Sequence, residues 1–254
     1  MGIILEEFDI NKEAVLNPSA TIKKMDDFPE YCVTTFNKRL IEAYVEKVGG
    51  KLIGELYSTH GNAPIYEVNY KGKRVAIYLS WVGAPACIAN FEEIIATGAK
   101  KVVMFGSCGV LDNTIDAEKI IIPNSAIRDE GTSYHYMPAS DEIETDREGN
   151  TAIIQVCEKL NIPYLEGKTW TTDALYRETR KKMEDRKNAG CITVDMECSA
   201  MNAVAKFRDI RFAQFFYSVD NLDAPEWESR GLGDFVTIEK EEYMLLALES
   251  AIRM

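Results

Sequence analysis

The 254-residue sequence has no long apolar run, no internal repeat and no low-complexity tract. No apolar stretch approaches the ~18 residues that cross a bilayer, so no membrane span is predicted. The N-terminus lacks the basic and apolar regions of a secretory signal, and we therefore expect a soluble, cytoplasmic protein. Because no Pro-, Gly- or Ser-rich linker divides the chain, residues 1–254 are predicted to form one domain. For residues 1–30, which carry no recognisable motif, a lid and an interface arm are both open.

Basic residues are scarce as well. There are 29 lysines and arginines against 41 aspartates and glutamates, which gives a net charge of −12. A chain this acidic lacks the electrostatic footprint for a phosphate backbone, so nucleic-acid binding is not expected. Anionic membrane surfaces are disfavoured for the same reason. A small anion could still bind where an arginine or a nest of backbone N–H groups outweighs the global field.

The sequence contains no Cys-x-x-Cys pair, and no Gly-x-Gly-x-x-Gly follows its first predicted strand. The second absence argues against a Rossmann dehydrogenase. In a chain of this size, cysteines set among apolar neighbours are more typical of small buried hydrophobes than of disulfides. The six cysteines interpreted in this way are Cys32, Cys87, Cys108, Cys157, Cys191 and Cys198. Apolar residues make up 46% of the chain, which is ample for a sizeable core.

Nearly continuous apolar runs alternate with helical patterns along most of the chain. Such runs are typical of strands covered on both faces, and the alternation predicts an α/β fold. We expect a single-domain, mixed and mostly parallel central β-sheet flanked by helices. Strands are predicted over residues 73–80, 101–105, 119–123, 191–195 and 212–219, and helices over 85–97, 151–160, 177–187, 196–207 and 238–252. Ligands of such sheets bind at the carboxyl ends of the strands, so the chemistry is expected in those loops.

Several of these loops carry residues suited to a binding site. Residues 106–109, Gly-Ser-Cys-Gly, predict either an anion-binding turn or a tight turn that small residues allow. Residues 80–87 (SWVGAPAC) form a second small-residue loop. Asp195 and Glu197 stand at a strand-to-helix junction, where carboxylates either cap the helix or accept hydrogen bonds from a sugar diol. Asp220, at the end of another strand, is a candidate general acid.

In this order and spacing, the segments VMFGSCGVL, VDMECSAM and YSVD resemble the nucleoside phosphorylase family. That family includes bacterial hexameric purine nucleoside phosphorylases, uridine phosphorylases and methylthioadenosine nucleosidases. The resemblance implies a pentosyltransferase of nucleoside metabolism, such as purine salvage, which releases the free base and a pentose 1-phosphate. It also implies phosphate as co-substrate and no metal or organic cofactor. The expected assembly is a homo-oligomer, either a dimer or a hexamer built as a trimer of dimers.

The resemblance further implies roles for the residues that match the family's motifs. Ser107 matches the serine that binds phosphate, and Asp220 matches the aspartate that protonates the purine N7. Met196 packs on the sugar, while Glu197 accepts hydrogen bonds from the 2′ and 3′ hydroxyls when its carboxyl is ionised. Arg230 is a candidate for the arginine that assists Asp220. The residues that match segments beside the base and the sugar are Cys108, Gly109, Thr172, Leu175 and Tyr176.

Two basic elements of the family's phosphate site are missing. Met104 stands where the phosphorylases carry an arginine, and TTFNKRL occupies the region of the usual N-terminal Gly-Asp-Pro-x-x-Arg loop. Each lost charge-assisted contact costs ~1.5–3 kcal/mol, so other cations have to replace them if phosphate binds. The candidate phosphate-binding cations are Arg39, His60 and Arg128. The alternative that these departures favour is a nucleosidase of the same fold, which uses water instead of phosphate.

The identity of the base is less constrained. Asp220 favours a purine, and the stretch YRETRKK lacks the glutamine of the uridine-specific pattern. However, Arg177 and Arg180 in that stretch keep a pyrimidine, and therefore a uridine phosphorylase, open. A third hypothesis is a non-catalytic nucleoside-binding protein on the same fold, which predicts tight binding without turnover.

Overall fold

The computed structural model describes residues 3–59, 61–233 and 240–254. Its central element is one ten-stranded sheet. The strands are β1 (Tyr31–Thr35), β2 (Lys51–Ser58), β3 (Gly61–Tyr70), β4 (Lys73–Leu79), β5 (Lys101–Val110), β6 (Ile120–Asp129), β7 (Glu142–Glu144), β8 (Tyr164–Thr172), β9 (Cys191–Asp195) and β10 (Arg211–Asn221). The α-helices are α1 (Lys38–Val48), α2 (Ala84–Thr97), α3 (Arg147–Leu160), α4 (Arg180–Asn188), α5 (Cys198–Arg208) and α7 (Glu241–Ala251).

The sheet is mixed. Parallel pairings run through β4, β1, β5 and β10 and, separately, through β6, β8 and β9. Antiparallel pairings add the β2–β3–β4 meander and join the two parallel groups, through β10 with β6 and β5 with β9. The strands β10, β6, β8, β9 and β5 therefore form a closed ring, from which β1, β4, β3 and β2 extend. This confirms the predicted α/β fold with a mixed sheet.

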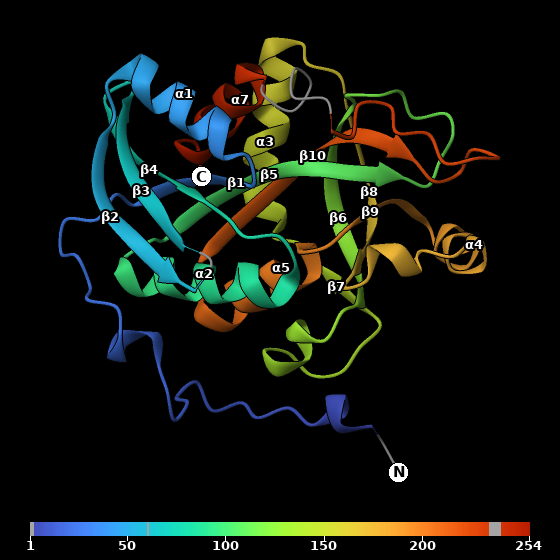
Figure 1. The fold of residues 1–254 in the computed structure, drawn as a ribbon, viewed down its shortest axis with the longest axis horizontal. Coiled ribbons are helices and arrows are strands. Elements are labelled where there is room, and N and C mark those ends of the chain that lie inside the picture. The colour runs from blue at the N-terminus through green and yellow to red at the C-terminus, as the bar shows by residue number, and fades with distance from the viewer. Residues whose placement is uncertain (1–2, 60, 234–239) are drawn as a thin grey trace.

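Helices cover both faces of the sheet (Figure 1). One apolar cluster packs α1, α3 and α7 against the sheet and includes the stacked rings of Phe105 and Phe215. A second cluster lies between the sheet and the helices α2 and α5. In Figure 1 the first set of helices lies above the sheet and the second set below it. Because β5 and β10 are covered on both faces, their sequences are almost continuously apolar.

Each of the predicted strands and helices corresponds to an observed element, and all but β9 have shifted ends. Residues 238 and 239, where the last helix was predicted to begin, lie outside the described residues. The main correction concerns residues 106–109, predicted as a turn, which instead lie inside β5. There β5 pairs with β10, so that Ser107 faces Tyr217 across the ladder. Strands β1, β2, β3, β7 and β8 and helix α1 were not predicted. The six cysteines are free and buried, as expected.

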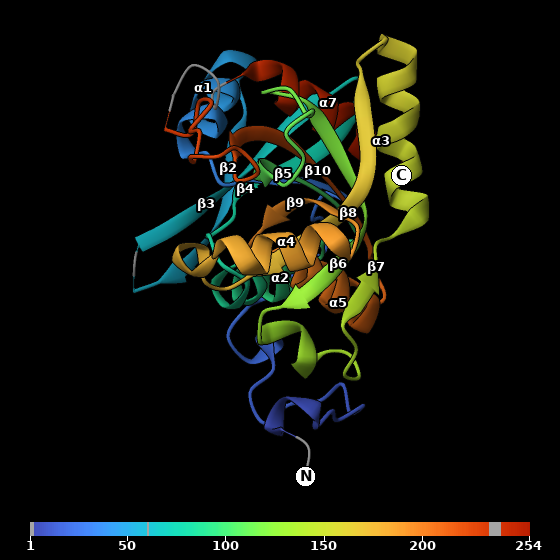
Figure 2. The ribbon, with the colours of Figure 1, turned by 90° about the vertical axis from the view of Figure 1, so that its right-hand side faces the viewer.

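Residues 3–30 precede the first strand and contain two short 3₁₀ turns, η1 (Ile4–Glu6) and η2 (Pro18–Ala20). Figure 2 shows this segment at the end of the molecule where α2 and α5 lie. The Arg208 guanidinium donates a hydrogen bond to the carbonyl of Lys12, and the Met25 N–H donates to the carbonyl of Thr97. Within the described ranges, no helix has the length and apolarity needed to cross a membrane.

Candidate active site

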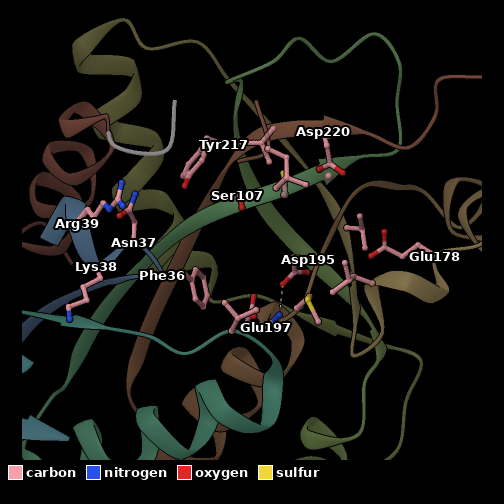
Figure 3. A pocket seen from close by; sticks show the side chains of 18 residues that line it. Phe36, Asn37, Lys38, Arg39, Ser107, Glu178, Asp195, Glu197, Tyr217 and Asp220 are labelled. Carbon is pink, nitrogen blue, oxygen red and sulfur yellow. Dashed lines mark hydrogen bonds between the residues drawn. The ribbon is translucent and has the colours of Figure 1, made fainter. Parts of the chain in front are cut away.

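A pocket of about 510 Å³ opens at the carboxyl ends of several strands (Figure 3). Its volume lies within the range of small-molecule sites. The segments that follow β1, β4, β8 and β9 meet the ends of β5 and β10 there, where the strand topology led us to expect chemistry. The lining residues are Phe36, Asn37, Lys38, Arg39, Val82, Ser107, Cys108, Gly109, Leu175, Glu178, Val194, Asp195, Met196, Glu197, Tyr217, Val219, Asp220 and Leu232.

One end of the pocket is basic. It is formed by the first turn of α1, where the Asn37 side chain caps the helix by accepting a hydrogen bond from the Leu40 N–H. Lys38 and Arg39 follow the cap, and Ser107 on β5 lines the same cavity. Figure 3 shows Asn37, Lys38 and Arg39 together at this end. The positive end of the helix dipole, two cations and a hydroxyl are the groups that bind a small anion.

Gly106 allows this basic end to approach β5. A Cβ at Gly106 would lie 2.8 Å from the Phe36 ring, which is the side chain immediately before the Asn37 cap. The glycine thus admits the ring, and the ring positions the start of α1 against the strand. Gly106 and Gly109 do not have positive φ angles. These glycines therefore do not form the predicted turn but make room for neighbouring side chains.

The two carboxylates at the strand-to-helix junction, Asp195 and Glu197, have different roles. Capping of the helix and hydrogen bonding to a sugar diol were predicted for both without distinction. Asp195 caps α5, because its Oδ2 accepts hydrogen bonds from the N–H groups of Glu197 (2.8 Å) and Cys198 (2.6 Å). Its Oδ1 accepts from the hydroxyls of Thr169 and Thr171 on β8. Burial nevertheless raises the pKa of Asp195 to about 6. The side chain is fully engaged within the protein, so its function is to hold this junction.

Glu197, by contrast, turns into the pocket and has few partners. Its Oε1 accepts a hydrogen bond from the Gly83 N–H (2.6 Å) in the small-residue loop after β4. Gly83 has a φ of 91°, a conformation that favours glycine. Burial, and then the charge of Asp195, raise the pKa of the Glu197 carboxyl to about 8. A buried carboxylate with a second oxygen available is suited to accept hydrogen bonds from hydroxyl groups of a ligand.

The other end of the pocket is acidic and otherwise mostly apolar. Asp220 lies at the end of β10 opposite Gly109, just after an irregularity in the register. Its Oδ2 accepts a hydrogen bond from the Trp227 indole N–H (2.9 Å). Burial raises the pKa of Asp220, although the Trp227 bond and the charge of Arg230 oppose the shift. A raised pKa is the property that a general acid near neutral pH requires.

The structure brings together most of the residues predicted for the site. Those that line the pocket are Arg39, Ser107, Cys108, Gly109, Leu175, Met196, Glu197 and Asp220. His60 lies outside the described residues. Thr172 is not among the lining residues; it is buried, and its hydroxyl accepts a hydrogen bond from the Ala174 N–H. Tyr176 is not a lining residue either, and its side chain is 93% exposed to solvent.

Both remaining predicted arginines are engaged by their own surroundings. Arg128 is only 4% exposed, and its guanidinium donates to the hydroxyls of Ser133 and Ser140 and to the Pro138 carbonyl. It therefore organises the loop after β6 and does not line this pocket, contrary to the prediction of a phosphate-binding role. Arg230 donates to the Ile115 carbonyl and pairs with Glu228. It lies close enough to Asp220 to lower that group's pKa, but it is not a lining residue.

Sequence reasoning missed several residues of the pocket wall, namely Phe36, Asn37, Lys38, Glu178 and Tyr217. The first three belong to the TTFNKRL segment, where Asn before a basic and apolar stretch is a helix-start signal that could have been used. Glu178 carried no comparable signal. Among the described residues, no cluster of three or more His, Cys, Asp or Glu side chains could hold a metal ion.

Replacing Gly109 by alanine is expected to damage the acidic end of the pocket. The added Cβ would lie 2.6 Å from Leu222 Cδ1, 3.0 Å from Val194 Cγ1 and 3.1 Å from Asp220 Oδ1. Overpacking of this kind costs about 1–3 kcal/mol, so thermal unfolding should move to lower temperature. Gly54→Ala is the matched control, since its Cβ would be 3.6 Å from Ile65, an ordinary contact. Equal melting temperatures for the two variants would contradict the packing argument.

Comparison with known proteins identifies a family. A family model described as the phosphorylase superfamily matches residues 31–249. The chain is 27% identical over 192 residues to a purine nucleoside phosphorylase of Plasmodium vivax (strain Salvador I), covering 74% of this chain and 78% of that protein. It is 25% identical over 191 residues to a uridine phosphorylase of Thermococcus kodakarensis, covering 70% and 69% respectively. The solved structure of a uridine phosphorylase from Vibrio fischeri ES114 matches its fold with a TM-score of 0.76 at 22% identity, covering 91% of this chain and 95% of that chain.

Proposed function

The chain belongs to the phosphorylase superfamily, and on that premise we propose that it is a nucleoside phosphorylase acting on purine nucleosides. The observation that carries the proposal is the way in which charged and polar side chains are distributed along the wall of this pocket. Lys38 and Arg39 lie at one end, Ser107 and the buried Glu197 lie across from each other in the middle, and Asp220 lies at the other end (Figure 3). This order matches the three parts of the reaction, which are an anionic nucleophile, a sugar diol and a leaving base.

In the proposed reaction, a phosphate oxygen attacks C1′ of the nucleoside as the bond from C1′ to the base nitrogen breaks. Phosphate is held at the first turn of α1 by Arg39, with Lys38 and the Ser107 hydroxyl as further donors. Ionised Glu197 accepts hydrogen bonds from the 2′ and 3′ hydroxyls. The electron pair of the broken bond passes to the base, which takes a proton on N7 from Asp220. The products are the free base and a pentose 1-phosphate.

A purine is favoured over uracil by the side chains at the base end. The only polar side chains on that wall are the carboxyls of Glu178 and Asp220, within the described part of the chain. Arg180, which kept a pyrimidine open, donates to the carbonyls of Leu222 and Pro225 and does not line the pocket. Uracil, with two carbonyl groups beside its N–H, would be poorly matched by two carboxyls.

A nucleosidase is the second candidate, and Met104 is the observation that favours it. Met104 is fully buried in the apolar cluster between the sheet and the helices α2 and α5, so this position supplies no cation to the pocket. The proposal of phosphorolysis therefore depends on the start of α1 supplying the missing positive charge. The expectations of a homo-oligomer, of a cytoplasmic protein and of activity without a cofactor stay predictions.

The experiment that tests the proposal is base release from adenosine, inosine, guanosine and uridine, each with and without phosphate, followed by absorbance. Phosphate-dependent release with formation of a sugar 1-phosphate is expected. Arg39→Ala should raise the KM for phosphate by about 10- to 100-fold, the worth of one charge-assisted hydrogen bond. Lys47→Ala, at the opposite end of α1 and paired with Glu241, is the control that should not alter it. Equal release without phosphate would establish the nucleosidase, and binding without release would establish a nucleoside-binding protein.

A further inference from the structure

The base end of the pocket contains a second carboxyl group that has no role in the reaction as proposed. Glu178 follows the short η4 turn (Leu175–Arg177), between β8 and α4. It lines the pocket together with Asp220 of β10, and Figure 3 shows both at the end away from Lys38 and Arg39. Two carboxyl groups of different chain segments thus line the end of the pocket where the proposed function places the base.

Glu178 sits at this position at an electrostatic cost. No described residue donates a hydrogen bond to its carboxylate, and the nearby Arg180 guanidinium is occupied by the carbonyls of Leu222 and Pro225. Burial and the charge of Asp220 raise the pKa of Glu178 to about 7. A carboxyl group held beside another without a compensating donor is typical of a functional site, where the ligand supplies the donor.

The groups along the edge of the purine ring determine which hydrogen-bond donor the ligand can present to Glu178. Asp220 is assigned to N7, and the purine atom next to N7 on the same edge is the substituent at C6. In adenine this edge presents the N7 acceptor and the N6 amino donor, whereas in guanine it presents two acceptors, N7 and O6. Hypoxanthine has the same N7 and O6 acceptors. A carboxylate beside Asp220 would accept a hydrogen bond from an amino group but would repel a carbonyl oxygen.

We propose that Glu178 makes this pocket selective for 6-aminopurine nucleosides over 6-oxopurine nucleosides, by accepting a hydrogen bond from the exocyclic amino group. The inference rests on the proposed function, because it takes the base to lie with N7 at Asp220. It assigns Glu178 as a specificity-determining residue and leaves the proton donor and the phosphate site unchanged.

The test compares kcat/KM for adenosine and inosine with saturating phosphate at pH 8, where Glu178 is mostly ionised. The wild-type protein should prefer adenosine by about tenfold or more, because the Glu178 carboxylate accepts a hydrogen bond from the amino group of adenosine but repels the carbonyl oxygen of inosine. In Glu178→Gln the preference should fall to within about threefold, since an amide can present either its oxygen or its N–H₂. Glu184→Gln, an exposed position on α4, is the control and should leave the ratio unchanged.

Binding of the free bases adenine and hypoxanthine, measured by calorimetry on the same proteins, gives a second readout that needs no turnover. The same loss of preference in Glu178→Gln is expected there. A wild-type preference for inosine or hypoxanthine, or a ratio that Glu178→Gln leaves unchanged, would overturn the inference. If no nucleoside is cleaved at all, the proposed phosphorylase function fails, while the base-binding ratio still decides the role of Glu178.

Discussion

Glu197→Gln is expected to lower kcat/KM for ribonucleosides by about 10²- to 10³-fold, since hydrogen bonds to a charged acceptor contribute ~1.5–3 kcal/mol each. In the proposed complex the carboxylate accepts hydrogen bonds from both the 2′ and the 3′ hydroxyl. A glutamine keeps one oxygen as an acceptor but loses the charge and offers an N–H₂ group in place of the other oxygen. With 2′,3′-dideoxyadenosine, which lacks both hydroxyls, the same substitution should have little further effect.

The pH dependence of the same variant distinguishes a ligand-binding role from a structural one. Burial and the charge of Asp195 raise the pKa of Glu197 to about 8, so the carboxylate that the sugar needs is depleted below that pH. In the wild-type protein kcat/KM should therefore rise as the pH approaches 8, and this component of the profile should be absent in Glu197→Gln. An unchanged profile, or an equal loss of activity with the dideoxynucleoside, would contradict the assignment.

The stability of the protein should fall over the pH range in which kcat/KM rises. The pKa of Glu197 is raised from its ordinary value of 4.5 to about 8, so between these values the folded state holds a proton that the unfolded chain has lost. Stability consequently falls as the pH rises through this window, and the full penalty is present above about pH 8. Glu197→Gln removes the penalty, so its melting temperature should exceed that of the wild-type protein at pH 9. A gain in stability together with a loss of activity is typical of a functional site.

The sequence was sufficient to locate this junction but not to separate its two carboxylates. Asp195 and Glu197 both stand at the start of a helix, where capping and ligand binding predict the same residue types. The separation depends on β8, whose Thr169 and Thr171 hydroxyls complete the partners of Asp195. Strand β8 was not predicted, because its sequence, YLEGKTWTT, is neither continuously apolar nor regularly alternating. The assignment of Asp195 could therefore not be made from the sequence.

The Gly-Ser-Cys-Gly motif shows the same limit. Two glycines at the end of an apolar run indicate a turn when only local propensity is considered. Each glycine is needed instead because a distant residue packs against it, Phe36 at Gly106 and Asp220 at Gly109. Strands tolerate glycine where another group approaches closely, and such contacts depend on tertiary structure. The motif thus marked the correct part of the chain for a reason that only the fold reveals.

The roles that could not be predicted from the sequence are those of isolated residues in connecting segments. Glu178 follows a short 3₁₀ turn, and its place beside Asp220 depends on how the segment after β8 crosses towards β10. Arg128 was a reasonable anion-binding candidate, since it begins a polar and aromatic loop. However, its guanidinium already donates four hydrogen bonds to the loop's own oxygens. The chemistry of a lone charged residue is decided by its neighbours in space.

Asp220→Asn should lower kcat for adenosine by about 10²- to 10⁴-fold, the usual contribution of a general acid. An asparagine can donate a hydrogen bond to N7 but cannot transfer a proton to it, so the leaving base would depart as an anion. The raised pKa of Asp220 fits the role, because it keeps the carboxyl protonated at a higher pH than an exposed aspartate. Asp223→Asn, in the same acidic segment but outside the pocket and paired with Lys187, should leave kcat nearly unchanged.

A nucleoside that needs no proton separates loss of the acid from damage to the pocket. A purine nucleoside methylated at N7 already carries a positive charge on its base, so its bond to the sugar breaks without protonation. Asp220→Asn should therefore cleave this substrate at nearly the wild-type rate, while it fails with adenosine. Equal losses on both substrates would mean that Asp220 shapes the site rather than donating a proton.

Trp227→Phe tests the same proton donor through its pKa, because the Trp227 indole N–H donates a hydrogen bond to the Asp220 carboxyl. Losing that donor removes an interaction that lowers the pKa of Asp220, so the basic limb of the adenosine profile should move to higher pH in this variant.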